Sequence, residues 1–492
     1  MKYVSTRGAH KDGVSSAYAI KTGLASDGGL FMPESIPQID LDYIKELSAL
    51  PYHQRAAKVL SLFLTDYDYE ELAKDTEEAY SKERFIPSPA PITELSGNRY
   101  MLELWHGPTC AFKDMALQLM PRLFARALKK CGEERTALIL VATSGDTGKA
   151  ALAGFANVEG VKICVFYPDG GVSAVQRAQM VTQEGNNVAV CAVKGNFDDA
   201  QTGVKNIFAL AEDGRLPDGN RLRLSTANSI NIGRLAPQIT YYFKAYADLL
   251  RRGQIKMGDT VNFCVPTGNF GDILAGWLAK RLGLPVGKLI CASNANNVLT
   301  DFVETGVYDR RRPLHKTVSP SMDILVSSNL ERLLYFLSGD TALVAKLMKS
   351  LNTEGIYEVP ADLKKAIKDE FWAGYCDDER AKATIKAVFD NQNYLCDTHT
   401  ATGWAVAEDY VNQTGDNRPM VVLSTASAYK FPAAVLSSLT TVPEMDEFAQ
   451  METLEKLTGW PIPENLSGLQ QKKDLHTDVI EKTAMPAYVM DL

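Results

Sequence analysis

The chain has 492 residues, too many for a single hydrophobic core, so two or three domains are expected. Hydrophobic residues make up 46% and charged residues 23%, as is usual for a globular protein in water, and the formal net charge is −8. This charge argues against nucleic acid and anionic membrane surfaces as partners, and no run resembles a membrane span or a cleavable signal.

The cysteines and histidines are too dispersed to predict a disulfide framework or a metal site. The eight cysteines form no C-x-x-C pair, and several, such as Cys164 and Cys264, lie inside apolar strand-like runs. This usage is typical of small buried side chains in a reducing compartment. The six histidines show no clustered spacing, so we expect a cytoplasmic protein without a metal centre.

Residues 1–91 are expected to form a helical lead-in. Helical spacing of apolar residues, or an acidic helical composition, marks three helices, over 41–50, 51–64 and 70–80. Pro87, Pro89 and Pro91 then form a stiff boundary. The alternation that follows, over 92–105, predicts a short strand or a hairpin.

Residues 106–114 (HGPTCAFKD) are arranged to aim one lysine. Gly107 and Pro108 predict a stiff turn, and apolar residues at helical spacing follow Lys113. Lys113 is therefore expected near a helix start and partly out of water, where the helix dipole and burial both lower the pKa of its amine. A neutral lysine can form a Schiff base or act as a general base. The alternative is a surface lysine after a turn.

From about residue 135 the pattern alternates between apolar strands and helices. Strands are expected over 136–142, 161–166, 187–193, 221–225, 260–265, 288–292 and 420–423. Helices are expected over 149–157, 172–184, 197–212, 232–252, 271–282 and 433–439, and residues 330–412 are expected to be mostly helical, including 330–337, 342–351 and 361–371. Continuous apolar strands that alternate with helices predict an α/β fold with parallel sheets covered on both faces.

Three strand ends carry loops suited to ligands, which bind beyond the carboxyl ends of strands in open parallel sheets. The first loop, 142–149, joins hydroxyls and glycines to a helix start, as suits a carboxylate or phosphate. It is not a nucleotide P-loop, because Thr143 and Ala150 stand where that motif needs glycine and a metal-binding hydroxyl. Lys149 is either a surface lysine or a phosphate ligand.

The second and third loops leave two interpretations open. Loop 266–272 (PTGNFGD) is either an anion cradle of backbone donors or a tight strand-to-helix turn without a ligand. Loop 423–427 (LSTAS) offers hydroxyls that either serve a ligand or cap a helix. Neither loop alone decides between these roles.

The ordered set of these motifs resembles the pyridoxal-phosphate enzymes of the tryptophan synthase β-subunit-like fold, and within them the longer threonine synthases of bacteria and fungi. The resemblance spans nearly the whole chain. Its motifs are YVSTRG at 3–8, LASDGGLF at 24–31, residues 106–114 and 142–149, ANSIN at 227–231, SPSMDI at 319–324, DTHTA at 397–401 and STA at 424–426.

The resemblance implies a role for each matched residue. Lys113 would hold pyridoxal 5'-phosphate, and Thr425 would meet the pyridine nitrogen, making the ring a weaker electron sink than an aspartate would. The loop that would bind the cofactor phosphate comprises Gly268, Asn269, Phe270, Gly271 and Asp272. The substrate would be bound by Ser144, Asp146, Thr147, Asn231 and Arg234.

Some of these roles keep alternatives. Many relatives have asparagine where this chain has Asp146. Asp146 would contact either the ring oxygen of the cofactor or the substrate. Arg234 and Lys149 are candidates for the leaving phosphate, and Arg234 is equally suited to a helix surface. We expect Arg310–Arg312 to form a solvated turn, His106 to make a structural hydrogen bond, and His399 to be a capping or core residue.

The resemblance also implies an activity, a substrate and a domain plan. The expected reaction converts O-phospho-L-homoserine and water to L-threonine and phosphate; the alternative is a phospho-lyase on the same scaffold that releases 2-oxobutyrate. The fold would comprise two parallel-sheet α/β domains of fold type II. We expect a large domain over 92–130 and 245–440, a smaller mobile domain over 131–244 and a tail over 441–492 packed on the large domain. The oligomeric state stays open between monomer and homodimer.

Overall fold

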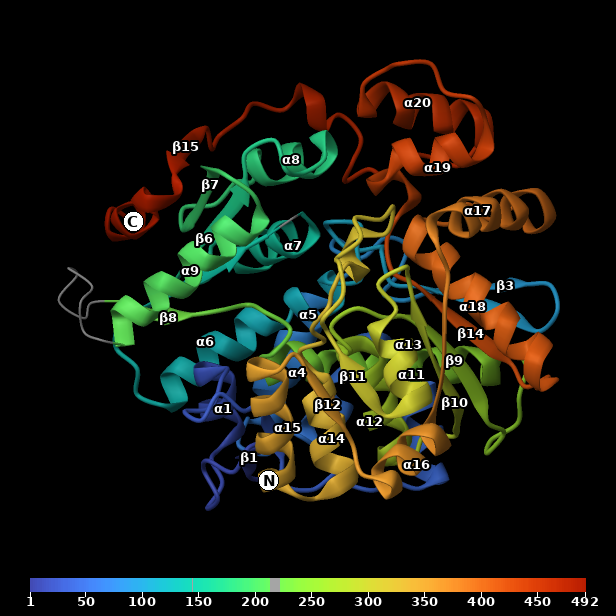
Figure 1. Ribbon diagram of the computed structural model, residues 1–492, viewed down its shortest axis with the longest axis horizontal. Helices are drawn as coiled ribbons and strands as arrows, with labels where there is room; N and C mark the ends of the chain where they lie inside the picture. The colour runs from blue at the N-terminus through green and yellow to red at the C-terminus, as the bar shows by residue number, and fades with distance from the viewer. Residues whose placement is uncertain (144, 213–221) are drawn as a thin grey trace.

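The computed structural model describes residues 1–143, 145–212 and 222–492. Two α/β lobes lie side by side, and each is built around its own, mainly parallel sheet (Figure 1). The N-terminus lies at the base of the larger lobe, whereas the C-terminus lies on the smaller one. The fold class predicted from the sequence is confirmed.

The larger lobe contains a six-stranded sheet in the order β13-β10-β9-β14-β4-β3. Only β3 runs antiparallel to its neighbour. The strands are β3 (Ile92–Leu95), β4 (Arg99–Glu103), β9 (Val261–Pro266), β10 (Val286–Ser293), β13 (Phe371–Tyr375) and β14 (Met420–Ser424). Because β4, β14 and β9 are parallel neighbours, their carboxyl ends at Glu103, Ser424 and Pro266 lie along one edge.

Helices cover this sheet as the buried strands require. The main ones packed on it are α12 (Gly271–Leu282), α13 (Val298–Thr305) and α18 (Thr398–Thr414). The helix predicted over 232–252 is interrupted at Pro237, which cannot donate a helical hydrogen bond. It comprises α10 (Ile232–Leu235), a 3-10 turn (Ala236–Gln238) and α11 (Ile239–Arg251).

The smaller lobe contains a five-stranded parallel sheet in the order β15-β7-β6-β5-β8. Its strands are β5 (Thr136–Ala142), β6 (Val161–Pro168), β7 (Val188–Lys194), β8 (Leu222–Ser225) and β15 (Asp478–Glu481). The helices that connect them are α7 (Asp146–Phe155), α8 (Ala174–Val181) and α9 (Phe197–Glu212). Four of these five strands occur where the apolar runs predicted them.

The C-terminal segment packs on both lobes, whereas the sequence predicts a tail packed on the large lobe alone. Helix α20 (Glu447–Thr458) packs on α19 (Pro432–Leu439), but it also contacts α8 of the smaller lobe. Beyond it, β15 adds an edge strand beside β7, and α21 (Met485–Met490) packs on α9. The prediction was wrong because the pairing of β15 is decided by the open edge of β7, which is far away in the sequence.

The N-terminal segment wraps the larger lobe. Its three predicted helices are α2 (Leu41–Ala49), α3 (Tyr52–Ser61) and α4 (Tyr69–Ala79). The elements that the sequence did not predict are β1 (Tyr3–Ser5), paired with β2 (Phe31–Pro33), and α1 (Ser16–Thr22), which packs on α6 (Met120–Lys130).

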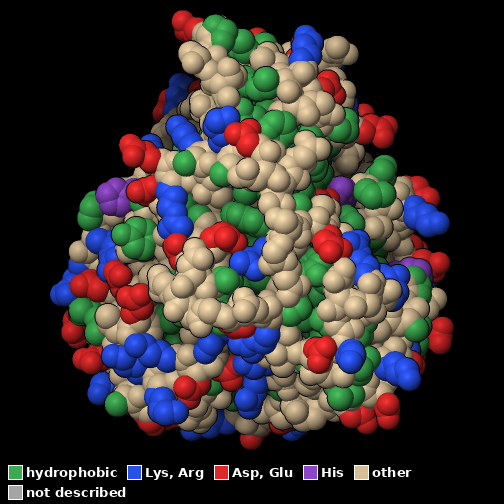
Figure 2. Space-filling view, turned by 90° about the vertical axis from the view of Figure 1, so that its right-hand side faces the viewer, with side chains coloured by type: hydrophobic (Ala, Val, Ile, Leu, Met, Phe, Trp, Pro, Cys, Tyr) green, Lys and Arg blue, Asp and Glu red, His purple; other side chains and the backbone are tan. Residues whose placement is uncertain are grey.

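The remaining helices follow the expected pattern. They include α14 (Leu330–Ser338), α15 (Thr341–Thr353), α16 (Ala361–Glu370) and α17 (Asp378–Gln392), with a short pair β11 (Val307–Asp309) and β12 (Ile356–Glu358). Within the described ranges no helix has the length and apolarity needed to cross a membrane. Charges of both signs are interspersed over the face shown in Figure 2.

Candidate active site

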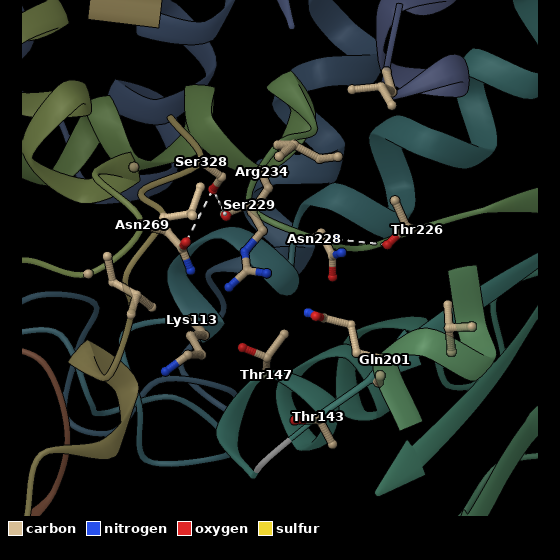
Figure 3. A pocket seen from close by; sticks show the side chains of 18 of the residues that line it. Lys113, Thr143, Thr147, Gln201, Thr226, Asn228, Ser229, Arg234, Asn269 and Ser328 are labelled. Carbon is tan, nitrogen blue, oxygen red and sulfur yellow. Dashed lines mark hydrogen bonds between the residues drawn. The ribbon is translucent and has the colours of Figure 1, made fainter. Parts of the chain in front are cut away.

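A cavity of about 1610 Å³ is lined by residues of both lobes and of the N-terminal segment. Apart from Ser144, which lies outside the described residues, and Asn231, every predicted site residue lines this cavity. Figure 3 shows the side chains of Lys113, Thr147 and Arg234 around the same space, into which the guanidinium of Arg234 points. The residues predicted from separate motifs thus lie around one cavity, although they are far apart in the chain.

Lys113 lies immediately before the short helix α5 (Asp114–Leu117). The turn in front of it is held by Asp114, whose carboxylate accepts hydrogen bonds from the backbone N–H and the hydroxyl of Thr109, both at 2.8 Å. A side chain at Gly107 could not fit, because its Cβ would lie 2.6 Å from that carboxylate. The sequence HGPTCAFKD thus packs its turn against its own aspartate.

The amine of Lys113 is buried and only loosely held. Its Nζ donates a hydrogen bond of 3.2 Å to Ser321 Oγ and lies 3.7 Å from Asp146 Oδ2. Burial lowers the pKa of Lys113, and the carboxylate of Asp146 opposes that shift. Such an amine can lose its proton and act as a nucleophile or a base.

The loop between β9 and α12 forms a set of open donors. The backbone N–H groups of Gly268, Asn269, Phe270 and Gly271 donate to no other described residue. Phe270 has a left-handed φ of 61°, and its buried ring packs against Phe371. A Cβ at Gly268 would lie 2.8 Å from the carbonyl oxygen of Ser321. Free donors at a helix N-terminus suit a phosphate group.

Asp272 lines the cavity, but its side chain is engaged in the packing behind the loop. Its Oδ1 accepts hydrogen bonds from the hydroxyls of Tyr241 at 2.5 Å and Tyr242 at 2.9 Å, and Oδ2 has no partner among the described residues. Burial raises the pKa of this carboxyl to about 6, against the opposing effect of the two tyrosines. The side chain of Asp272 is therefore bonded away from the open donors.

Thr425 follows β14 at the carboxyl edge of the large sheet. Its backbone N–H donates to Thr400 Oγ1 at 3.3 Å, and its carbonyl accepts from Phe112 N–H at 2.8 Å. Its hydroxyl bonds to no other described residue. The late strand and the lysine turn are thus fastened together, with a free hydroxyl in the cavity.

His399 and Ser321 were not predicted as site residues, yet both line the cavity. Asp397 caps α18 and accepts from His399 Nδ1 at 2.7 Å, and Ser321 N–H donates to His399 Nε2 at 3.1 Å. His399 is therefore a core histidine that also fastens the loop whose hydroxyl meets Lys113. The motifs 319–324 and 397–401 were visible in the sequence; the contact between them was not.

Asp146 begins α7 and is shared by several partners. Its Oδ1 accepts from Lys430 Nζ at 2.9 Å and from Gln176 Nε2 at 3.0 Å. Burial alone would raise the pKa of Asp146, but the ammonium groups of Lys430 and Lys113 hold it well below its ordinary value. Lys430 escaped the sequence analysis; the available signal was a lysine inside the apolar run Ala428–Phe431.

The remaining predicted residues separate into cavity and packing roles. Arg234 lines the cavity, donates to the carbonyl of Ala227 at 2.8 Å, and has a pKa lowered to about 10 by burial. Asn231 is fully buried: it accepts from Gly233 N–H and donates to the carbonyl of Ile20. This capping role leaves the side chain of Asn231 outside the cavity.

Of the other basic groups considered earlier, Arg310 lines the cavity and donates to the carbonyl of Asn352 at 3.1 Å, whereas the rest occupy different places. Lys149 donates to Gln183 Oε1 at 2.6 Å and is absent from the cavity wall. Arg311 and Arg312 pair with Asp309 and Asp301. His106 bridges the carbonyl of Ile86 and the carboxylate of Glu103, which is the structural role expected for it.

Comparisons with known proteins point to one family. Family models match residues 2–80 (threonine synthase N terminus), 78–426 (pyridoxal-phosphate dependent enzyme) and 400–485 (threonine synthase, C-terminal). The chain is 41% identical to threonine synthase of Pseudomonas aeruginosa, over 88% of this chain and 90% of that protein. It is 40% identical to human threonine synthase-like 1, over 86% of this chain and only 57% of that longer protein.

A solved structure agrees. The crystal structure of pyridoxal-phosphate-bound threonine synthase from Brucella melitensis superposes with a TM-score of 0.88 at 38% identity, covering 100% of this chain and 99% of that one.

Proposed function

Because the chain belongs to the threonine synthases among the pyridoxal-phosphate-dependent enzymes, we propose that it converts O-phospho-L-homoserine and water to L-threonine and phosphate. The observation that carries this proposal is the buried amine of Lys113, which shares one interlobe cavity with an open set of backbone donors. We also place the enzyme in the cytoplasm, since all eight cysteines are free thiols.

Pyridoxal 5'-phosphate is the cofactor of this family, and the described residues fit it. Lys113 would hold it covalently, the unused N–H groups of Gly268–Gly271 would bind its phosphate, and the free hydroxyl of Thr425 would meet its pyridine nitrogen. When bound, the cofactor supplies an electron sink for negative charge at the substrate carbon next to the amine. Asp272 would contribute its backbone N–H to this phosphate site, because its side chain is held by the hydroxyls of Tyr241 and Tyr242.

The substrate would lie between the lobes. Thr147 on α7 and Ser144, which is outside the described residues, would hold the α-carboxylate near the positive end of the α7 dipole. Arg234 is suited to the phosphate of the substrate, since its guanidinium faces the cavity next to Lys113 (Figure 3). Asn231 drops out of this proposal because its amide caps α10.

Lys113 would carry the proton transfers. Its Nζ would remove the proton from Cα of the substrate and later return one to the same atom. Between these steps a proton leaves Cβ, phosphate leaves Cγ, Cγ is protonated and water adds to Cβ. A neutral amine on a flexible four-carbon stem can reach several of these atoms on one face of the substrate.

Product analysis tests the proposal against a phospho-lyase on the same scaffold. Incubation of the cofactor-loaded enzyme with O-phospho-L-homoserine should release phosphate and threonine in equal amounts. Lys113→Ala should lose activity by at least about 1000-fold, because no other group replaces this amine. Predominant 2-oxobutyrate would favour the lyase, and near wild-type turnover by Lys113→Ala would remove the lysine from the chemistry.

A further inference from the structure

Lys430 is a fully buried lysine that the proposed chemistry does not use. It ends a 3-10 turn (Ala428–Lys430) that follows the Thr425 loop, and its side chain is 0% exposed. Its Nζ donates to Gln179 Oε1 at 2.6 Å, to Thr109 O at 3.0 Å and to Asp146 Oδ1 at 2.9 Å. Three acceptors match the three N–H bonds of an ammonium group, so this cage is complete for a protonated lysine.

The same carboxylate faces two ammonium groups at unequal distances. Lys430 Nζ lies 2.9 Å from Oδ1 of Asp146, whereas Lys113 Nζ lies 3.7 Å from Oδ2. Gln176 adds a second donor on the Lys430 side, at 3.0 Å. Because charge interactions weaken with distance, Asp146 is neutralised mainly by Lys430.

We propose that Lys430 is a positioning residue, whose ammonium holds the carboxylate of Asp146 in place and cancels most of its charge beside the Lys113 amine. Without Lys430, Asp146 would have only one cation left to pair with. It would then bind the proton on Lys113 more tightly, and a protonated lysine can neither attack a carbonyl nor remove a proton.

The other charges around Lys113 act in the same balance. Burial of Lys113 lowers its pKa first, Asp146 on α7 raises it, Arg234 on α10 and Lys430 lower it, and Asp114 on α5 raises it. On the remaining side, His399 on α18 faces Lys113 only through Ser321, whose N–H it accepts. Asp146 and Lys430 are thus the one strongly paired anion and cation in this set.

The cage also joins the two lobes at the lysine turn. Asp146 and Gln179 belong to α7 and α8 of the smaller lobe, whereas Thr109 belongs to the turn that presents Lys113. A buried charge must keep its partners, because leaving one unpaired is costly. Lys430 therefore fixes where the smaller lobe places Asp146 relative to Lys113.

The inference rests on the proposed function only in taking Lys113 as the reacting amine, and its test needs neither substrate nor turnover. The cofactor-free protein would be labelled with acetic anhydride between about pH 6 and pH 10, and acetylation of Lys113 followed by peptide mass spectrometry. Lys430→Met keeps the volume and removes the charge. Lys149→Met is the matched control, since Lys149 is a half-buried neighbour that bonds to Gln183 and not to Asp146.

We expect Lys430→Met to raise the midpoint of Lys113 labelling by about one pH unit, equivalent to roughly tenfold slower labelling below the midpoint. Lys149→Met should move it by less than about 0.3 unit. Asp146→Asn should lower the midpoint, and adding Lys430→Met to Asp146→Asn should raise it by clearly less than Lys430→Met does alone, because the carboxylate through which Lys430 acts is then absent.

An unchanged or lowered midpoint in Lys430→Met, or an equal rise in Lys149→Met, would overturn the proposal. If Lys430→Met alone does not fold, Asp146→Asn decides. An unchanged or raised midpoint in Asp146→Asn would show that this carboxylate does not hold the proton on Lys113, and it would reject the role of Lys430. Either result is independent of which product the enzyme makes.

Discussion

At the scale of single residues, the site contains two buried aspartates that differ in their hydrogen-bond and ion-pair partners. Asp146 has two close donors on one oxygen, whereas Asp272 has two tyrosine hydroxyls on one oxygen and no described partner on the other. A well-paired carboxylate stays ionised when buried, and a poorly paired one resists ionisation. The pKa of Asp146 is therefore lowered, whereas the pKa of Asp272 is raised.

Asp272 gives a prediction for stability against pH. Its folded-state pKa of about 6 lies above the ordinary value of 3.8, so its stabilising contribution is present below about pH 4 and is lost as the pH rises through 6. Asp272→Asn cannot lose a proton and keeps an acceptor for the two tyrosines. Relative to wild type, its free energy of unfolding should gain about 2 kcal/mol between about pH 4.5 and pH 7.5.

Urea unfolding of both proteins at the two pH values measures this difference. Since every other group titrates alike in both proteins, the change in their difference isolates Asp272. A difference that stays constant, or that falls as the pH rises, would contradict the pKa assigned to this carboxyl.

The sequence identified some of these residues and missed others for a physical reason. Lys113 and the loop 266–272 carry local signals, because a Gly-Pro turn and a glycine-flanked helix start are written in neighbouring residues. Lys430, inside an apolar run, and Ser321, inside the motif 319–324, carry only signals that do not reveal a role. Their roles depend on partners that are distant in the sequence, such as Asp146 and His399, and only the fold brings these together.

At the scale of elements, α7 and α5 are packed backbone to backbone. A Cβ at Gly154 in α7 would lie 1.9 Å from the carbonyl oxygen of Leu117, the last residue of α5. Asp146 starts α7 and Lys113 directly precedes α5. The absent side chain of Gly154 thus helps to set the distance between these two groups.

Gly154→Ala should therefore impair both stability and activity. Backbone cannot yield as a flexible side chain can, so α7 must shift, at a cost of about 1–3 kcal/mol in the free energy of unfolding. We expect kcat to fall more than KM rises, because the displaced Asp146 changes the surroundings of Lys113. Thermal unfolding and initial rates check this, with Ala153→Ser on the same helix as a control. Wild-type stability in Gly154→Ala would contradict the close approach.

Element prediction succeeded where burial is continuous and failed where pairing is decided at a distance. Strands β5, β6, β9 and β14 are mostly apolar and were located from that pattern alone. By contrast, Phe371 was assigned to the end of a helix but begins β13, which pairs with β10. Strand β15 was missed because three of its four residues are exposed and only β7 defines it.

At the scale of the whole molecule, the C-terminal segment connects the two lobes. After building the larger lobe, the chain returns to complete the smaller sheet, and Met485 and Val489 enter its core beside Leu138 and Phe166. Both side chains are fully buried. The last segment is thus part of the smaller lobe rather than an appendage.

Deletion of residues 477–492 should destabilise the smaller lobe. It removes two buried side chains and exposes the edge of β7. Loss of the Met485 side chain should cost about 2–5 kcal/mol in the free energy of unfolding, and loss of the smaller Val489 side chain somewhat less. We expect a lower thermal midpoint and a smaller soluble yield. Val479→Thr, at an exposed position of β15, is the control, and an unchanged midpoint in the deleted protein would contradict the assignment.

The position of β14 has a consequence for synthesis on the ribosome. This strand lies between β9 and β4, although it follows all other strands of the large sheet in the chain. Until residue 424 emerges, the nascent polypeptide holds two half-sheets whose facing edges stay unpaired and able to bind other chains. The strand that leads to Thr425 closes this gap, so the catalytic cleft cannot form before translation is nearly finished.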